Sequence, residues 1–221
     1  MVDGMITELD TVVGPPPGEA GWGSSAEGHP MRTVTREVAF DPASWTPAKQ
    51  AEVAAFFDDL APAWNTRDVP NRKLTLQDAL DRGVPAAPDA ERRVALELGG
   101  GTGIYAEALA ARFPTLVTLD LSTEMMVRVP AGAALRVQGD GSNLPFADGA
   151  LDALILVNMF LFPLEADRVV APDGVVVWVN SRGPDTPIHL PAADVERALP
   201  GDWTGVAAQA GWGTWSTHWR S

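Results

Sequence analysis

The stretch of sequence that decides the fold is VALELGGGTG, residues 94–103. Its first five residues form a mainly apolar run of the kind found in buried strands, and glycine follows at positions 99, 100, 101 and 103. Glycine lets the backbone turn tightly and approach a ligand closely because it has no Cβ atom. A helix expected from Ile104 to Phe113 would present free N–H groups at the same place. The stretch therefore predicts a strand, a ligand-binding turn and a helix in succession.

Strand and helix patterns alternate after this turn. Apolar runs predict four more strands, at residues 116–120, 134–138, 151–157 and 175–179. Helices are expected over 122–129 and 164–170, and the sequence Pro-Asp-Gly predicts a turn at 172–174. Such βαβ units pair in parallel, whereas the helix expected over 192–199 is followed by strands 203–208 and 213–219, which predict a hairpin. We expect an α/β fold, a Rossmann-like three-layer sandwich whose mostly parallel seven-stranded sheet ends in a C-terminal antiparallel hairpin.

The region before residue 90 differs in composition from the alternating part. Residues 13–30 are rich in glycine, proline and serine and cannot bury enough apolar surface to offset their ordering entropy. In residues 46–64 apolar side chains recur at helical spacing behind Thr46, a typical helix cap, and a shorter helix is expected over 74–80. We therefore expect three parts: a flexible N-terminal leader over 1–30, a helical lid region over 31–90 and a ligand-binding core over 91–221.

Composition limits the classes of function. The formal net charge is −13, with 29 acidic and 16 basic residues, and a phosphate backbone attracts the opposite balance, so no nucleic-acid partner is expected. The chain has no cysteine, which excludes disulfides, thiolate nucleophiles and cysteine-ligated metal sites. No apolar run approaches the roughly 18 residues of a membrane span, and the N-terminus lacks the pattern of a secretory signal. We expect a soluble, cytoplasmic protein with no membrane partner, and its oligomeric state stays open.

The glycine turn is compared with three classes of ligand-binding loop. A dinucleotide fingerprint has glycine at its first, third and sixth positions, and Ile104 occupies the sixth. A Walker-type phosphate loop needs Gly-Lys-Ser/Thr, and no lysine follows Lys73. The remaining pattern is E-x-G-x-G-x-G at residues 97–103, in which the chain resembles the class I S-adenosylmethionine-dependent methyltransferases. The resemblance covers about residues 94–219, and FDDLAPAWN at 57–65 is similar to the lead-in helix of members that act on small molecules.

The resemblance implies which residues bind S-adenosylmethionine. Glu97 and the glycine backbone hold the methionyl ammonium and carboxylate, and Asp120, which ends the next strand, accepts the ribose hydroxyls. Asp140 takes the adenine amino group. The whole implied set, with apolar walls for adenine and ribose included, is Glu97, Gly99, Gly101, Gly103, Asp120, Leu121, Met125, Asp140, Gly141, Val157 and Asn158.

A methyl acceptor is expected outside the carboxyl ends of the strands, beneath the N-terminal helices. Trp64, Phe160 and Arg182 are the expected acceptor-binding residues, and His189 is the expected catalytic base if the acceptor is a hydroxyl. The resemblance implies methyl transfer to a small-molecule acceptor. Two alternatives stay open: a non-catalytic S-adenosylmethionine-binding sensor or scaffold, and a nicotinamide-dependent oxidoreductase, which Ile104 disfavours.

Most of the eight tryptophans have a packing explanation. Aromatic residues pack well on strands, which accounts for Trp178 in the strand expected at 175–179 and for four more near the terminal hairpin. Trp22 lies in the expected leader, so Trp45 and Trp64 are the two that we consider for an acceptor pocket.

Overall fold

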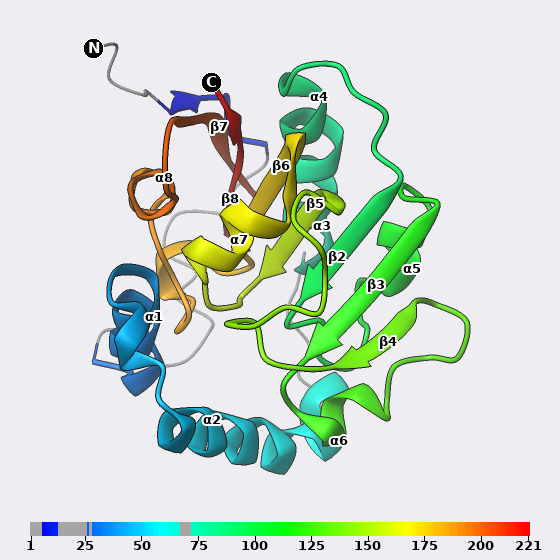
Figure 1. The fold of residues 1–221 in the computed structure, drawn as a ribbon, viewed down its shortest axis with the longest axis vertical. Coiled ribbons are helices and arrows are strands. Elements are labelled where there is room, and N and C mark those ends of the chain that lie inside the picture. The colour runs from blue at the N-terminus through cyan, green and yellow to red at the C-terminus, as the bar shows by residue number, and fades with distance from the viewer. Residues whose placement is uncertain (1–5, 13–25, 27, 67–71) are drawn as a thin grey trace.

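A computed structural model describes residues 6–12, 26, 28–66 and 72–221, so most of the expected leader lies outside the described residues. Within the described residues, eight strands form one sheet in the order β1-β7-β8-β6-β5-β2-β3-β4 (Figure 1). The strands are β1 Thr7–Glu8, β2 Val94–Leu98, β3 Thr115–Asp120, β4 Leu135–Gln138, β5 Leu151–Val157, β6 Val170–Asn180, β7 Trp203–Ala210 and β8 Gly213–Arg220.

The strands pair in parallel except at the C-terminal hairpin. β2 lies between β3 and β5, β4 extends the sheet beyond β3, and β6 lies beside β5, all in parallel. β8 runs antiparallel between β6 and β7. Ala210 pairs with Gly213, so the hairpin turn consists of two residues. The mostly parallel α/β sheet and its antiparallel hairpin are therefore confirmed.

The eighth strand, β1, comes from the expected leader. Thr7 pairs with Val206 and Glu8 pairs with Ala207, in parallel with β7. The backbone N–H of Leu9 donates to the carbonyl oxygen of Ala207 at 2.7 Å. The sheet thus has one strand more than the seven predicted. A two-residue strand is too short for an alternating pattern to reveal it, because its pairing depends on the unpaired backbone groups of β7.

β6 begins earlier than predicted, and the prediction of a separate turn at 172–174 is wrong. Val170 already pairs with Leu151, and Val175 pairs with Ala153, so residues 171–174 bulge within the strand. A proline has no N–H to donate to a neighbouring strand, which explains a bulge at Pro-Asp-Gly rather than regular pairing. The backbone also approaches closely here, because a Cβ on Gly174 would lie 3.0 Å from the carbonyl oxygen of Leu151.

Helices cover both faces of the sheet. Leu96 and Leu154 belong to an apolar cluster under α1, α7 and α8, whereas their neighbours Ala95 and Ile155 belong to a second cluster under α3 and α5. Adjacent strand residues point to opposite faces, so the sheet is buried on both sides and the three-layer prediction is confirmed. The helices are α1 Pro30–Phe40, α2 Pro47–Leu60, α3 Arg72–Asp78, α4 Val84–Ala86, α5 Ala106–Ala110, α6 Thr123–Met126, α7 Pro163–Val169 and α8 Ala192–Ala198.

Two N-terminal helices, α1 and α2, lie near the end of the sheet where β2 and β3 finish (Figure 1). The predicted cap of α2 is confirmed, because the Thr46 hydroxyl accepts from the Lys49 N–H at 3.3 Å. No helix was predicted at the position of α1. It begins at His29, whose Nδ1 accepts from the Met31 N–H at 3.2 Å, and histidine is not among the usual cap residues. Each helix in the described ranges is too short or too polar to cross a bilayer.

Candidate functional site

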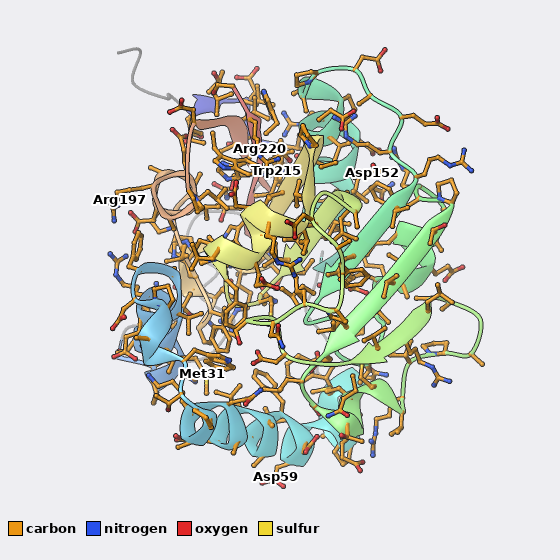
Figure 2. The ribbon with its side chains drawn as sticks, viewed as in Figure 1. Met31, Asp59, Asp152, Arg197, Trp215 and Arg220 are labelled. Atoms are coloured by element: carbon orange, nitrogen blue, oxygen red, sulfur yellow. The ribbon has the colours of Figure 1, made fainter. Side chains whose placement is uncertain are left out.

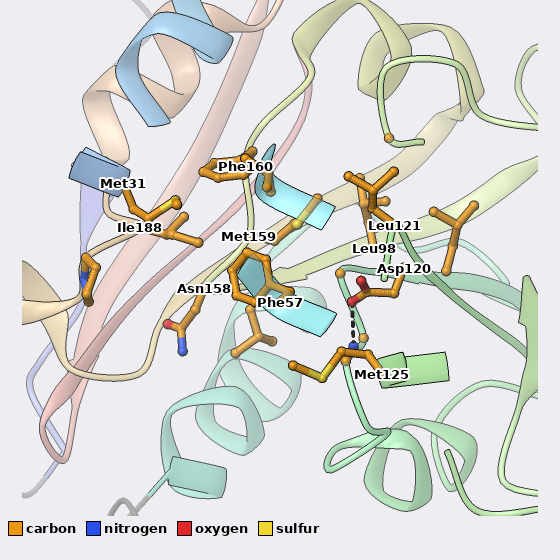
Figure 3. Close-up of a pocket in the computed structure, with 18 of the residues that line it drawn as sticks. Met31, Phe57, Leu98, Asp120, Leu121, Met125, Asn158, Met159, Phe160 and Ile188 are labelled. Atoms are coloured by element: carbon orange, nitrogen blue, oxygen red, sulfur yellow. Dashed lines mark hydrogen bonds between the residues drawn. The ribbon is translucent and has the colours of Figure 1, made fainter. Parts of the chain in front are cut away.

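A cavity of about 380 Å³ opens at the carboxyl ends of the parallel strands (Figure 3). α2 and the N-terminal end of α1 contribute to its lining, as do the turns that follow β2, β3, β4, β5 and β6. The structure brings most of the predicted site residues together there. These are Gly99, Gly101, Asp120, Leu121, Met125, Asp140, Gly141, Val157, Asn158, Trp64, Phe160 and Arg182. Glu97, Gly103 and His189 do not line the cavity.

The glycine turn has the backbone conformation that its sequence suggests. Gly99, Gly101 and Gly103 all have positive φ, at 72°, 58° and 77°. A Cβ on Gly101 would have Trp64 Nε1 at 3.6 Å and Met125 Sδ at 3.9 Å as its nearest neighbours, which is ordinary contact distance. The backbone of Gly101 therefore faces the cavity with no side chain over it, and a ligand can approach it closely.

Asp120 connects the turn after β2 with the turn after β3. One carboxylate oxygen accepts from the Gly101 N–H at 2.8 Å (Figure 3). The other accepts from the Ser122 N–H at 2.9 Å. Burial raises the pKa of this carboxyl, and the backbone donors of Ser122 and Gly101 oppose the rise. Each oxygen has two lone pairs, so an oxygen holding one N–H can still accept from a ligand hydroxyl.

Glu97 lies behind the glycine turn rather than in it. It is 1% exposed, and a Cβ on Gly100 would come within 2.9 Å of its Oε2. The Thr118 hydroxyl donates to Oε2 at 3.2 Å, whereas Oε1 is buried and has no hydrogen-bond partner among the described residues. Burial raises the pKa of Glu97 to about 8, and nearby Asp120 contributes to the rise. The carboxyl is therefore mostly protonated at neutral pH in the unliganded protein.

Asp140 follows β4 and is held from several sides. Its Oδ1 accepts from Trp45 Nε1 at 3.0 Å and from the Ser142 N–H at 2.9 Å, and its Oδ2 accepts from the Ser142 hydroxyl at 2.6 Å. The Trp45 ring packs edge-on against Phe162 with ring centroids 5.3 Å apart. The Phe162 ring in turn leaves no room for a side chain at Gly141, where a Cβ would lie 2.6 Å from it. Trp45 thus lies at the turn after β4.

The opposite end of the cavity lies between α1 and the loop after β6. Asn158 has φ of 51°, the one positive value among the described non-glycine residues, and its side chain exchanges hydrogen bonds with Ser181 at 2.8 and 2.9 Å. Strained backbone of this kind persists only where surrounding contacts enforce it, often at functional sites. The Arg182 N–H donates to the Thr186 hydroxyl at 3.1 Å. The apolar lining at this end comes from Met31, Phe57, Met159, Phe160, Pro187 and Ile188.

A methyltransferase-domain model matches residues 96–178, which run from β2 into β6. The solved DhpI–SAH complex shares the fold, with a TM-score of 0.57, 18% identity and coverage of 75% of this chain and 93% of that chain. A SAM-dependent methyltransferase from Thermotoga maritima, described as a possible histamine N-methyltransferase, has the same fold with a TM-score of 0.56 and 14% identity. The match covers 76% of this chain and 99% of that chain. The chain belongs to the class I methyltransferase family.

Two curated relatives of this chain have different names. Malonyl-(acyl-carrier protein) O-methyltransferase of Dechloromonas aromatica (strain RCB) is 34% identical over 67% of this chain and 57% of its own length. Demethylmenaquinone methyltransferase of Thermobifida fusca (strain YX) is 32% identical over 67% of this chain and 66% of its own length. The match spans less than two thirds of either relative's length.

His189 lies beside the cavity and does not line it, although its neighbour Ile188 does. Burial and the nearby Arg32 guanidinium lower the pKa of His189 to about 4, so the imidazole is neutral at pH 7. Its predicted catalytic role stays a prediction.

Some residues that line the cavity have no feature in the sequence that indicates a site. Met31, Phe57 and Ile188 have the same residue types as ordinary core positions, so their role depends on which segments fold together. Trp45 lines the cavity, where its ring lies 5.8 Å from that of Phe160 and its Nε1 donates to Asp140, and its predicted place in an acceptor pocket stays a prediction.

Proposed function

We propose that this chain transfers a methyl group from S-adenosylmethionine to a small-molecule acceptor. The observation that carries the proposal is the meeting of two turns at one wall of the cavity, where the Gly101 N–H donates to the Asp120 carboxylate at 2.8 Å. A bare glycine backbone beside a carboxylate suits a ligand with a charged amino-acid end and a sugar.

The residues present fit S-adenosylmethionine. A buried Glu97 oxygen that no described residue hydrogen-bonds lies behind the turn, and the backbone at Gly101 is open to the cavity. We infer that the glycine turn holds the methionyl end, that Asp120 accepts from the ribose hydroxyls and that Asp140 accepts from the adenine amino group. When bound, this cofactor supplies an electrophilic methyl group on a sulfonium. The chain's task is then to orient an acceptor and keep water out.

The acceptor end of the cavity supports a largely apolar acceptor with an anionic group, such as a carboxylate. Arg182 is the one lysine or arginine among the lining residues in the described part of the chain. His29 also lines the cavity, and its Nδ1 accepts from the Met31 N–H, so in this arrangement its Nε2 carries the proton and donates. Both groups are suited to an anion. A carboxylate carries its lone pair at neutral pH and needs no base, which agrees with the position of His189 outside the lining.

The relatives' names support an acceptor that is not a nucleic acid. One name specifies O-methylation of malonyl-(acyl-carrier protein), and the other specifies demethylmenaquinone. The division into leader, lid region and core, and the cytoplasmic location, stay predictions from the sequence.

Calorimetric titration with S-adenosylmethionine and S-adenosylhomocysteine tests the cofactor. Binding of both is expected, and no binding at millimolar concentration would overturn the proposal. Tighter binding of NADH than of S-adenosylmethionine would favour an oxidoreductase.

Mass spectrometry after incubation with matched carboxylates, alcohols and amines on one apolar body then tests the acceptor. Methylation of the carboxylates is expected, and methylation of the alcohols or amines alone would contradict the anionic class. Cofactor binding without transfer to any compound would favour the non-catalytic module. Arg182→Met should weaken carboxylate binding to the S-adenosylhomocysteine-loaded protein, whereas Arg182→Lys should retain part of it and neither variant should change cofactor affinity.

A further inference from the structure

We propose that three side chains of the segment 45–65, Trp45, Asp58 and Asn65, are positioning residues that hold the three cofactor-binding turns in place. Each one makes a side-chain hydrogen bond to a different turn, after β2, β3 or β4. The inference rests on the proposed function, because it takes these turns to be the cofactor site. Under this proposal the segment 45–65 contributes to cofactor binding as well as lying over the acceptor.

The first contact reaches the glycine turn. The Thr102 hydroxyl, between two of the positive-φ glycines, donates to Asn65 Oδ1 at 2.5 Å. Thr102 is 2% exposed, so little water competes for this bond. A glycine-rich turn has many accessible backbone states, and one fixed side chain in its middle reduces their number. Asn65 thereby restricts the turn to the conformation that leaves Gly101 open.

The second contact reaches the turn after β3. Asp58 on α2 accepts from the Ser122 hydroxyl at 2.5 Å and from the Glu124 N–H at 3.0 Å. Ser122 also donates its backbone N–H to Asp120. The Asp120 carboxylate therefore accepts from the turn after β2 and from the turn after β3. Asn65 bonds the first of these turns, and Asp58 bonds the second.

The third contact reaches Asp140 directly. Trp45 Nε1 and the Ser142 N–H both donate to Oδ1, so Oδ1 has both of its lone pairs engaged. Oδ2 holds only the Ser142 hydroxyl among the donors described. We infer that Trp45 fixes the carboxylate with Oδ2 available to the adenine amino group. Loss of the indole N–H should then impair the distinction between adenine and a base with a carbonyl at that position.

A matched control for Asp58 exists one residue away. Asp59 is exposed and projects from α2 away from the rest of the domain (Figure 2). Asp59→Ala removes the same charge from the same helix without a contact to a turn. Asp58→Asn keeps an oxygen that can accept from Ser122 and Glu124, whereas Asp58→Ala removes it.

For Trp45, the variant Trp45→Phe keeps an aromatic ring and removes only the donor. Trp203→Phe is the control, because Trp203 Nε1 bonds Pro200 in another part of the fold.

The experiment is calorimetric titration of the full chain with S-adenosylhomocysteine and with its deaminated analogue, S-inosylhomocysteine. We expect Asp58→Ala to weaken S-adenosylhomocysteine binding by about five- to tenfold, since it removes two hydrogen bonds to a carboxylate. Asp58→Asn should restore most of this loss, and Asp59→Ala should bind as the wild type. Trp45→Phe should weaken S-adenosylhomocysteine binding by about three- to tenfold and reduce its preference over the inosyl analogue.

Several results would overturn the proposal. Wild-type affinity in both Asp58→Ala and Trp45→Phe would do so, as would equal losses in the control variants, which would indicate general destabilisation. A Trp45→Phe variant with an unchanged preference for adenine would show that Trp45 does not position Asp140. If the wild-type protein binds neither ligand, the proposed function itself fails, and the positioning roles fail with it.

Discussion

Glu97→Gln should change how the stability of this protein depends on pH. The pKa of Glu97 is about 8 in the folded protein, because the side chain is fully buried, against 4.5 for the ordinary carboxyl. Below about pH 4.5 the Glu97 carboxyl is protonated in both states, and its contribution to stability is complete. As pH rises from there through 8, the carboxyl ionises in the unfolded chain before it does in the folded protein, so this contribution is lost. Over the full shift the loss is on the order of 5 kcal/mol at 1.36 kcal/mol per pKa unit.

Between about pH 6.5 and about pH 8 the comparison of wild type with Glu97→Gln isolates this effect, because the other groups with shifted pKa values, Asp120 and His189 among them, are common to both proteins. Burial lowers the pKa of His218 to about 3, so its contribution is present above pH 6.5 and is lost only as pH falls. Between these two pH values the wild-type free energy of unfolding should fall by roughly 2 kcal/mol through Glu97, and Glu97→Gln should lack this fall.

Urea denaturation at several pH values in this window measures the effect, with exposed Glu52→Gln as the control. Parallel curves for wild type and Glu97→Gln would refute the reasoning and would mean that Glu97 is already ionised in the folded protein.

Three further changes test the site. Asp120→Ala should weaken S-adenosylhomocysteine binding by about 1 to 3 kcal/mol in calorimetry, because it removes charge-assisted hydrogen bonds, and unchanged affinity would make Asp120 purely structural. Gly101→Ala should lower stability by about 1 to 2 kcal/mol because Gly101 has positive φ, and it should also reduce cofactor affinity. The control is Gly132→Ala, which should lower only stability, because Gly132 has φ of 80° and open space around it. Asn158→Gly should unfold at a higher temperature than Asn158→Ala, since glycine accepts φ of 51° freely, and the reverse order would exclude backbone strain there.

The core of the fold was predictable from local patterns. β2 and β5 were predicted at their observed bounds, because an apolar run between polar or glycine-rich segments has few other interpretations. That the glycines and carboxylates at strand ends line one cavity was also predictable, since the topology brings the carboxyl ends of these strands together.

The remaining features depend on contacts between segments far apart in the sequence. Trp45 and Asp140 are 95 positions apart, and nothing near either residue indicates that they bond. Glu97 is buried behind the turn and does not line the cavity, so its expected contact with the cofactor stays a prediction. The Pro-Asp-Gly bulge in β6 has the composition of a turn, and only its pairing with β5 reveals that the strand continues.

The pairing of β1 with β7 has a consequence for solubility. Beyond the Thr7–Glu8 pairing, the Val12 N–H donates to Gln209 and the Gly211 N–H donates to Val12, both at 2.9 Å, so this short segment covers the outer margin of the hairpin. A polypeptide trimmed up to Val12 would leave those backbone groups of β7 able to pair with a strand from another molecule. Residues 7–12 thus cover the edge of β7, and their removal should favour edge-to-edge aggregation.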